Sequence, residues 1–183
     1  LFIVSKRPLE KCVRIVHGGL RQKYKKIASV LHAFREEPIT RQRMLRKISE
    51  KECAVMAIYL NKRRVYTKLQ NEKAVLYNYV ANILLDRIMT KRLIPISEPV
   101  YLIASKRETN KFLNENFREY LKGQIRNAHR LDLHIEIKTP AEEKSLQAVD
   151  FISWAIFRRL EQGDDSYYNL IRSKIIEENP LFP

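Results

Sequence analysis

Four apolar segments of the chain have the pattern of β-strands. Residues 53–60 (CAVMAIYL) and 100–104 (VYLIA) are continuously apolar, which is typical of strands buried on both faces of a sheet. Residues 131–138 (LDLHIEIK) alternate between apolar and polar, which predicts a strand near a sheet edge with one face in solvent. Residues 1–4 (LFIV) are interpreted as the end of a further strand.

Apolar residues recur every three or four positions in other parts of the chain, and this spacing predicts helices. The expected helices cover residues 9–26, 38–49, 62–92, 110–123, 144–162 and 165–176, with residues 177–183 as an irregular tail. We expect a break near Gln70 and Asn71 in the third segment, and Gly163 closes the fifth. Because strands alternate with helices, the sequence predicts a layered α/β fold in one domain over residues 1–183.

Composition places the chain among ordinary folded proteins. Hydrophobic residues make up 45% and charged residues 31% of its 183 residues. No apolar run approaches the roughly 18 residues that span a bilayer, and no signal-peptide pattern is present. Two cysteines, Cys12 and Cys53, are too few for a disulfide framework or a four-cysteine zinc site. We therefore expect a cytoplasmic protein, and the first residue, Leu1, predicts that further residues precede it in the gene.

Positive charge is concentrated in the first third of the chain. Residues 1–70 contain 18 Lys and Arg against 5 Asp and Glu, whereas residues 71–183 contain 17 against 16. This asymmetry predicts contact with nucleic acid, RNA or DNA, or with another polyanion; the alternative is a set of solvated helix faces. Membrane binding is not expected, because the basic segments lack an opposing apolar face. The candidate phosphate-binding residues are Arg21, Lys23, Lys25, Lys26, Arg41, Arg43, Arg46, Lys47, Lys62, Arg63 and Arg64.

Asp150 is the most informative single residue. It lies in the otherwise apolar run AVDFISWAIF, in which the only other polar residue is Ser153. A carboxylate in such surroundings needs a partner: a metal ion, a cationic side chain or a helix N-terminus. The structural alternative is an Arg partner, a backbone hydrogen bond or a solvated edge. Gln147 precedes it by three residues and shares its helix face. His32 is a lone histidine, which is more often structural than catalytic, and none of the common catalytic motifs is present.

The C-terminal block from Lys144 to Ile175 resembles a large family of uncharacterised RNase H-like domains. That family ends with a Leu-Gln-x-x-Asp helix, a Gly-Asp turn and a Tyr-rich segment. Here these motifs are Leu146-Gln147-x-x-Asp150, Gly163-Asp164 and Tyr167-Tyr168. A His-Ala segment (His32-Ala33), the strand and turn CAVMAIYLNKRRVY, and the helix LYNYVANILLDRI also fit.

The resemblance implies an RNase H-like fold, with a central mixed sheet and helices on both faces. It also implies a carboxylate cluster that binds one or two Mg²⁺ or Mn²⁺ ions to polarise a phosphodiester and activate water. Asp150 matches the family's helix carboxylate and is the predicted catalytic metal ligand. No organic cofactor is implied.

The sequence departs from the family pattern at its other acidic positions. The Asp-Glu-Ser-Gly strand that opens the family is missing from these residues, Val30 replaces a frequent Glu, and Ala104-Ser105 replace an Asp. One carboxylate does not hold two divalent ions at ordinary affinity, so we expect His32, Ser105 and Glu108 as substitute ligands or a degraded site. The missing strand is central in such sheets; we expect upstream residues or another chain, such as a second copy in a homodimer, to fill its place.

Three functions follow from these observations. The first is a nucleic-acid-binding RNase H-like protein with an incomplete nuclease site. The second is an active Mg²⁺- or Mn²⁺-dependent nuclease completed by upstream residues. The third is a protein-interaction module without nucleic-acid activity.

Overall fold

A computed structural model describes residues 5–20, 30–61, 64–65, 72–95, 99–106 and 110–181. It divides the chain into two compact units. The first comprises Leu1–Val55 and Thr139–Ile176, and the second comprises Met56–Lys138 and Glu177–Pro183. The described residues form an α/β protein with five helices and four strands, the strands in two small parallel two-stranded sheets.

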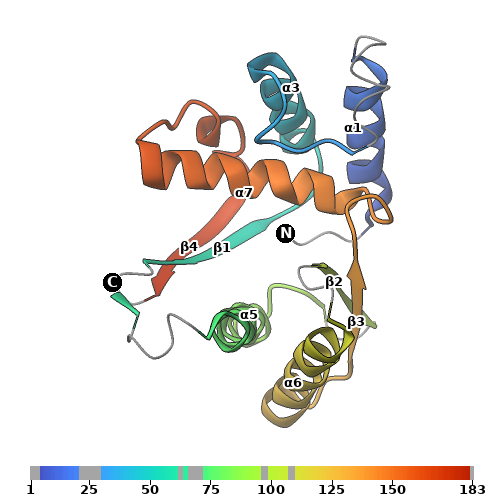
Figure 1. Cartoon of the computed structure of the whole chain (residues 1–183), viewed down its shortest axis with the longest axis vertical. Helices are drawn as coiled ribbons and strands as arrows, with labels where there is room; N and C mark the ends of the chain where they lie inside the picture. Colours follow the sequence, from blue (N-terminus) through green and yellow to red (C-terminus); the bar gives the residue numbers. More distant parts are fainter. Residues whose placement is uncertain are drawn as a thin grey trace. The chain divides into compact units, whose positions relative to one another are not determined.

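The first unit contains three helices that pack on one another. They are α1 (Arg7–Gly18), α3 (Pro38–Ser49) and α7 (Ser145–Gln162). Figure 1 shows α1 and α3 side by side, both against α7. Proline in the first turn of α1 and of α3 favours a helix start there, since that position needs no hydrogen-bond donor. Gly163, with φ of 66°, ends α7 in a left-handed conformation that favours glycine.

The core of the first unit is formed by side chains from these three helices and from the segments beside them. Phe151 of α7 is fully buried, as are the apolar faces of α1 and α3 and Ile171 in the segment after α7. Its fully buried large apolar side chains are Leu9, Val16, Leu31, Met44, Leu45, Ile48, Phe151 and Ile171.

In α1 the apolar positions at 3–4 spacing are all buried, as the sequence predicts: Leu9, Cys12, Val13 and Val16. In α7 the sequence places Ser153 and Leu160 on the packed face, but both are exposed. The buried face of α7 runs through Ala148, Phe151 and Ala155 instead.

A partly buried ion pair connects the starts of α1 and α7. The Glu143 side chain is 2% exposed, and Lys6 Nζ donates a hydrogen bond to its Oε2 at 2.6 Å. The backbone N–H and the hydroxyl of Ser145 donate to its Oε1. Burial raises the pKa of this carboxyl, but the hydrogen bonds from Lys6 and Ser145 outweigh burial and hold the pKa below its usual value. Glu143 is thus a charged structural group.

The second unit contains a parallel pair of strands covered by helices. The strands β2 (Val100–Ser105) and β3 (Leu133–Lys138) pair with Leu102 opposite Ile135. The helix α6 (Lys111–His129) packs on β3 and on α5 (Lys73–Thr90). Phe117, Leu121 and Ile125 of α6 are buried, as are Leu133 and Ile135 of β3.

The remaining two strands form the second small sheet. The strand β1 (Val55–Leu60) neighbours β4 (Ile175–Leu181). Glu177 in β4 accepts hydrogen bonds from Lys91, Asn179 and Arg87. These contacts, that from Lys91 first, lower the pKa of the Glu177 carboxyl to about 2. Ion pairs therefore connect the C-terminal strand to the end of α5.

Most predicted elements are confirmed, with corrections at the end of α1, in α6 and near the C-terminus. The helix predicted over 9–26 ends at Gly18, because two consecutive glycines weaken it there, and residues 19 and 20 form a turn. The helix α6 passes through Gly123 and continues to His129, because the buried stripe continues at Ile125 and outweighs the helix penalty of one glycine. The helix expected over 165–176 is wrong: two 3₁₀ turns, Tyr168–Leu170 and Arg172–Lys174, lead into β4. The tail expected to be irregular is therefore a strand up to Leu181.

The predicted α/β class is confirmed, whereas no central mixed sheet is shown by the residues that the structure describes. The predictions of a strand at 1–4, of helix at 21–26 and of a first helical piece before residue 71 fall outside the described residues, apart from positions 64 and 65. The prediction of a single domain stays a prediction. Within the described ranges, no helix is long and apolar enough to cross a membrane.

Candidate functional site

Asp150 binds the backbone of the segment that contains His32. Its Oδ2 accepts a hydrogen bond from the N–H of Ala33 at 2.9 Å and lies 3.8 Å from Nδ1 of His32. The second distance exceeds hydrogen-bonding range. The side chains of Asp150 and His32 are 45% and 43% exposed. The polar residue in the apolar run thus lies at a solvated edge and satisfies a backbone donor from a segment 117 residues earlier.

Gln147, one helical turn before Asp150, binds the same segment from inside the protein. It is 2% exposed, and its Oε1 accepts from the N–H of Leu31 at 3.1 Å. Its Nε2 donates to the carbonyl of Pro140 at 2.7 Å. The Leu-Gln-x-x-Asp spacing therefore places two acceptors on one helix face, and both hold the turn that begins at Leu31.

Arg41 holds the other side of this turn. Its Nε donates to the carbonyl of Ala33 at 2.6 Å, and its Nη2 donates to the carbonyl of Phe34 at 2.9 Å. Its guanidinium lies over the ring of Trp154, 4.5 Å from the ring centroid, which is a cation–π geometry. Arg158 lies 5.4 Å from the same centroid. Arg41, predicted to bind phosphate, directs these donors to the backbone instead.

The residues around Asp150 do not fit a two-metal site. Among the described residues, no group of three or more His, Cys, Asp or Glu side chains is placed to hold a metal ion. At this position Asp150 of α7 supplies one carboxylate, which already accepts a backbone hydrogen bond, and His32 supplies one imidazole. Glu108 lies outside the described residues. Two-metal catalysis needs several carboxylate oxygens around both ions. No catalytic step is therefore assigned to a metal at this position.

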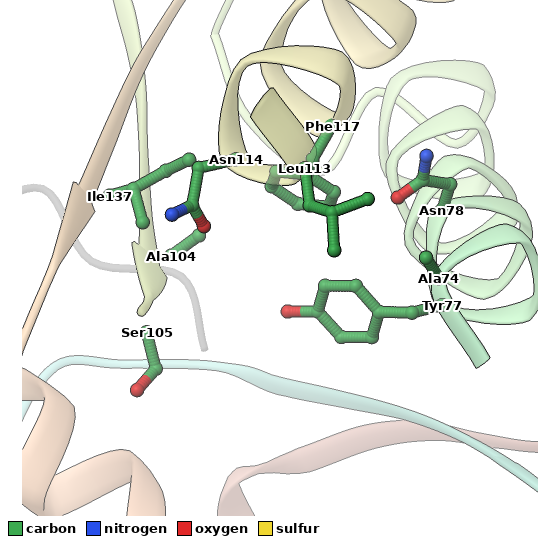
Figure 2. A pocket seen from close by; sticks show the side chains of 9 residues that line it. All are labelled: Ala74, Tyr77, Asn78, Ala104, Ser105, Leu113, Asn114, Phe117 and Ile137. Atoms are coloured by element: carbon green, nitrogen blue, oxygen red, sulfur yellow. The ribbon is translucent and has the colours of Figure 1, made fainter. Parts of the chain in front are cut away.

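Ser105, the third predicted ligand, lies in the second unit at the end of β2. It lines a small pocket of about 30 Å³ between the carboxyl ends of β2 and β3 and the first turns of α5 and α6. Figure 2 shows the Tyr77 ring reaching toward β2, with Asn114 coming from α6. The lining residues are Ala74, Tyr77, Asn78, Ala104, Ser105, Leu113, Asn114, Phe117 and Ile137. None of them is an acidic residue or a histidine, so this pocket offers no metal-binding set.

Exposed cations of α1 and α3 form the basic part of the first unit. Arg7, Lys11 and Arg14 are exposed at positions i, i+4 and i+7 of α1, which places them on one helix face. Arg43 and Arg46 are exposed on α3. Among the described residues only Arg14 of these five has a carboxylate partner, and its Nη2 lies 3.5 Å from Glu10 on α1.

The predicted phosphate-binding residues have different surroundings. The Arg43 guanidinium lies across the end of α1, where a Cβ at Gly19 would collide with it. Lys47 Nζ lies 3.0 Å from a Glu50 oxygen, which compensates its charge. Arg64 is exposed in the second unit. The other predicted residues, Arg21, Lys23, Lys25, Lys26, Lys62 and Arg63, lie outside the described residues.

Comparisons with known proteins do not assign the chain to a family. Scans against protein-family models, curated proteins and solved structures found no match. The resemblance of the C-terminal block to RNase H-like domains therefore stays a prediction.

Sequence reasoning missed one prominent residue, Phe34. It follows Ala33 directly and its side chain is 82% exposed, which makes it the most exposed large apolar side chain in the part of the chain that the structure describes. Its position after the His-Ala pair was the available signal, but an exposed aromatic in a loop has no periodicity that identifies it. The candidate surface of the first unit thus combines a turn held by hydrogen bonds with exposed cations on two helices.

Proposed function

We propose that this protein is an RNase H-like nucleic-acid-binding protein whose metal-dependent nuclease site is incomplete. The basic helices of the first unit bind the phosphate backbone. Asp150 occupies the position of the family's catalytic helix carboxylate, but together with Gln147 it positions the turn at Leu31. The central mixed sheet of that fold is part of this proposal.

The observation that carries the proposal is the set of exposed cations on α1 and α3. Four cations on these helices are exposed and have no carboxylate partner among the described residues: Arg7, Lys11, Arg43 and Arg46. Uncompensated Arg and Lys on neighbouring helices attract polyanions, because bound phosphate releases condensed counterions. Solvated faces of ordinary helices more often carry both signs of charge. Residues 1–55, which contain both helices, have 14 Lys and Arg against 5 Asp and Glu.

Contacts around Asp150 support the second half of the proposal. Asp150 Oδ2 accepts the Ala33 N–H at 2.9 Å, so one of its two oxygens already has a structural role. The positions where the family has further acids are occupied by Val30 and Ser105. A single carboxylate beside one histidine is a poor site for Mg²⁺. The exposed cations therefore bind the nucleic acid, and this ligand set does not support its cleavage.

Two pairs of substitutions with equal charge change test the location of binding. Arg43→Ala/Arg46→Ala removes two cations from α3, and the control Lys73→Ala/Lys111→Ala removes two exposed cations from α5 and α6 in the second unit. Affinity for a labelled 20-nucleotide single strand is measured by fluorescence anisotropy between 50 and 300 mM salt. We expect the α3 pair to weaken binding and to reduce the slope of log K against log salt by about 1.4, roughly 0.7 per lost phosphate contact.

The outcomes separate the three functions. Equal weakening by both pairs contradicts a binding surface on α3 and indicates a general charge effect. Absence of any binding at 50 mM salt refutes the proposal and leaves a protein-interaction module. Cleavage of the strand with Mn²⁺ that Asp150→Ala abolishes contradicts the incomplete site and indicates an active nuclease.

A further inference from the structure

The turn from Leu31 to Glu36 is fixed by hydrogen bonds on all sides. Gln147 and Asp150 accept from the N–H groups of Leu31 and Ala33, as described above. Arg41 donates to the carbonyls of Ala33 and Phe34. Within the turn, the N–H groups of Arg35 and Glu36 donate to the carbonyl of His32 at 2.9 and 3.1 Å. Three side chains and the His32 carbonyl thus determine one conformation of this turn.

This fixed turn places one aromatic side chain in solvent. Leu31 and Ala33 are fully buried, yet Phe34 is 82% exposed. A single exposed apolar side chain is common on protein surfaces and needs no explanation. Here, however, hydrogen bonds hold the backbone around Phe34. They come from Arg41, whose guanidinium lies over the Trp154 ring, and from Asp150. Such a ring is preorganised, because little backbone entropy is lost when a flat ligand stacks on it.

Charge in the surroundings points to the kind of ligand. Arg41 connects the turn to α3, and α3 presents Arg43 and Arg46 to solvent. The turn's own acids, Glu36 and Glu37, lie at the start of α3, where the positive end of the helix dipole favours them. Arg35, the residue after Phe34, is exposed as well. An exposed ring with an exposed arginine next to it and further arginines on the helix that follows is a combination with which proteins bind single-stranded nucleic acid, since bases stack on rings while cations contact phosphates.

We infer that Phe34 is a stacking platform for an unpaired base of a single-stranded nucleic acid whose phosphates are bound by α3. This inference rests on the proposed function and names the form of nucleic acid that the site accepts. Bases in a duplex are stacked on each other and offer no free face to Phe34. The protein therefore discriminates single strands from duplexes at this turn.

An abasic ligand isolates stacking from charge. The wild-type protein is titrated with a labelled 12-nucleotide thymidine strand and with an abasic strand of the same length, which has the same phosphates and no bases; a uridine strand reports the preference between DNA and RNA. We expect the thymidine strand to bind tenfold or more tightly than the abasic strand. Phe34→Ala removes this difference and leaves binding of the abasic strand and the salt slope unchanged.

Two control variants make the result specific. Phe34→Tyr retains an aromatic face and retains the preference for bases. Phe112→Ala removes a 73% exposed Phe from α6 in the second unit and leaves the preference intact. Because Trp154 is the only tryptophan and contacts Arg41, its emission gives an independent signal: the thymidine strand changes it more than the abasic strand does. Phe34 is exposed, so its replacement is compatible with folding, which circular dichroism verifies.

Failure of this inference is distinguishable from failure of the proposed function. If wild type binds both strands equally and with a steep salt dependence, phosphate binding stands and the stacking role of Phe34 is refuted. If wild type binds neither strand, both are refuted. If Phe34→Ala leaves the base preference unchanged but converts a dimer to a monomer in sedimentation, the ring is a contact between copies of this chain, and the inference is overturned.

Discussion

Replacing Asp150 distinguishes a group that positions the turn from a group that holds a metal. Asp150→Ala removes the acceptor of the Ala33 N–H, and Ala33 is fully buried. Asp150→Asn removes the negative charge but keeps a side-chain oxygen that accepts the same hydrogen bond. A metal ligand tolerates neither change, whereas a hydrogen-bond acceptor tolerates the second.

The expected magnitude follows from the geometry. A hydrogen bond to a charged group contributes roughly 1.5–3 kcal/mol, and an unpaired buried donor costs about 1–3 kcal/mol. Because the Asp150 side chain is 45% exposed, water replaces part of the lost interaction. We therefore expect Asp150→Ala to lower the free energy of unfolding by about 1–2 kcal/mol and Asp150→Asn to lower it by less than about 0.5 kcal/mol.

Urea denaturation followed by Trp154 emission measures both variants. With a denaturant slope of about 2 kcal/mol/M, Asp150→Ala shifts the midpoint down by roughly 0.5–1 M. Trp154 lies in the first unit and is the only tryptophan, so its signal reports on the unit that contains the substitution. Equal destabilisation by Ala and Asn, or none by Ala, would refute the positioning role.

The same structure makes two further predictions. Gln147→Ala leaves the buried N–H of Leu31 without its acceptor, and we expect a loss of about 2–3 kcal/mol in urea denaturation against the exposed control Gln162→Ala of the same helix; a loss equal to the control's would contradict the buried bond. The pKa of Glu177 is lowered from 4.5 to about 2 in the folded protein, so its contribution to stability is present above pH 4.5 and is lost as the pH falls toward 2. Measured by thermal unfolding, Glu177→Gln is therefore less stable than wild type at pH 6 by about 1 kcal/mol and similar to it near pH 2, and a difference independent of pH would contradict this ion pair.

Local patterns predict most of the elements of this chain. The starts of α1 and α3 near proline, the end of α7 at glycine and the strands predicted at 53–60, 100–104 and 131–138 are confirmed, because each depends on residues close in sequence. The end of α6 was predicted too early, because a helix-weakening glycine is tolerated when the buried face continues. The strand β4 was missed, because its pairing with β1 and the ion pairs of Glu177 come from distant residues.

The candidate site was only half predictable for the same reason. The sequence identified Asp150 and Gln147 as polar groups on one helix face, and the structure confirms that they act together. It did not identify their partner, the turn at Leu31, since that contact joins residues more than 100 positions apart. Nor did composition show that Arg41 is bound to backbone while Arg43 and Arg46 face solvent. Charge counts alone treat these three arginines as equivalent.

Hydrogen exchange with and without a saturating single-stranded oligonucleotide, read by mass spectrometry, tests the location of binding directly. The account predicts slower exchange in peptides that cover α1, α3 and the turn around Phe34, and unchanged exchange in peptides from α6. Protection confined to the second unit, or no protection anywhere at low salt, would contradict it.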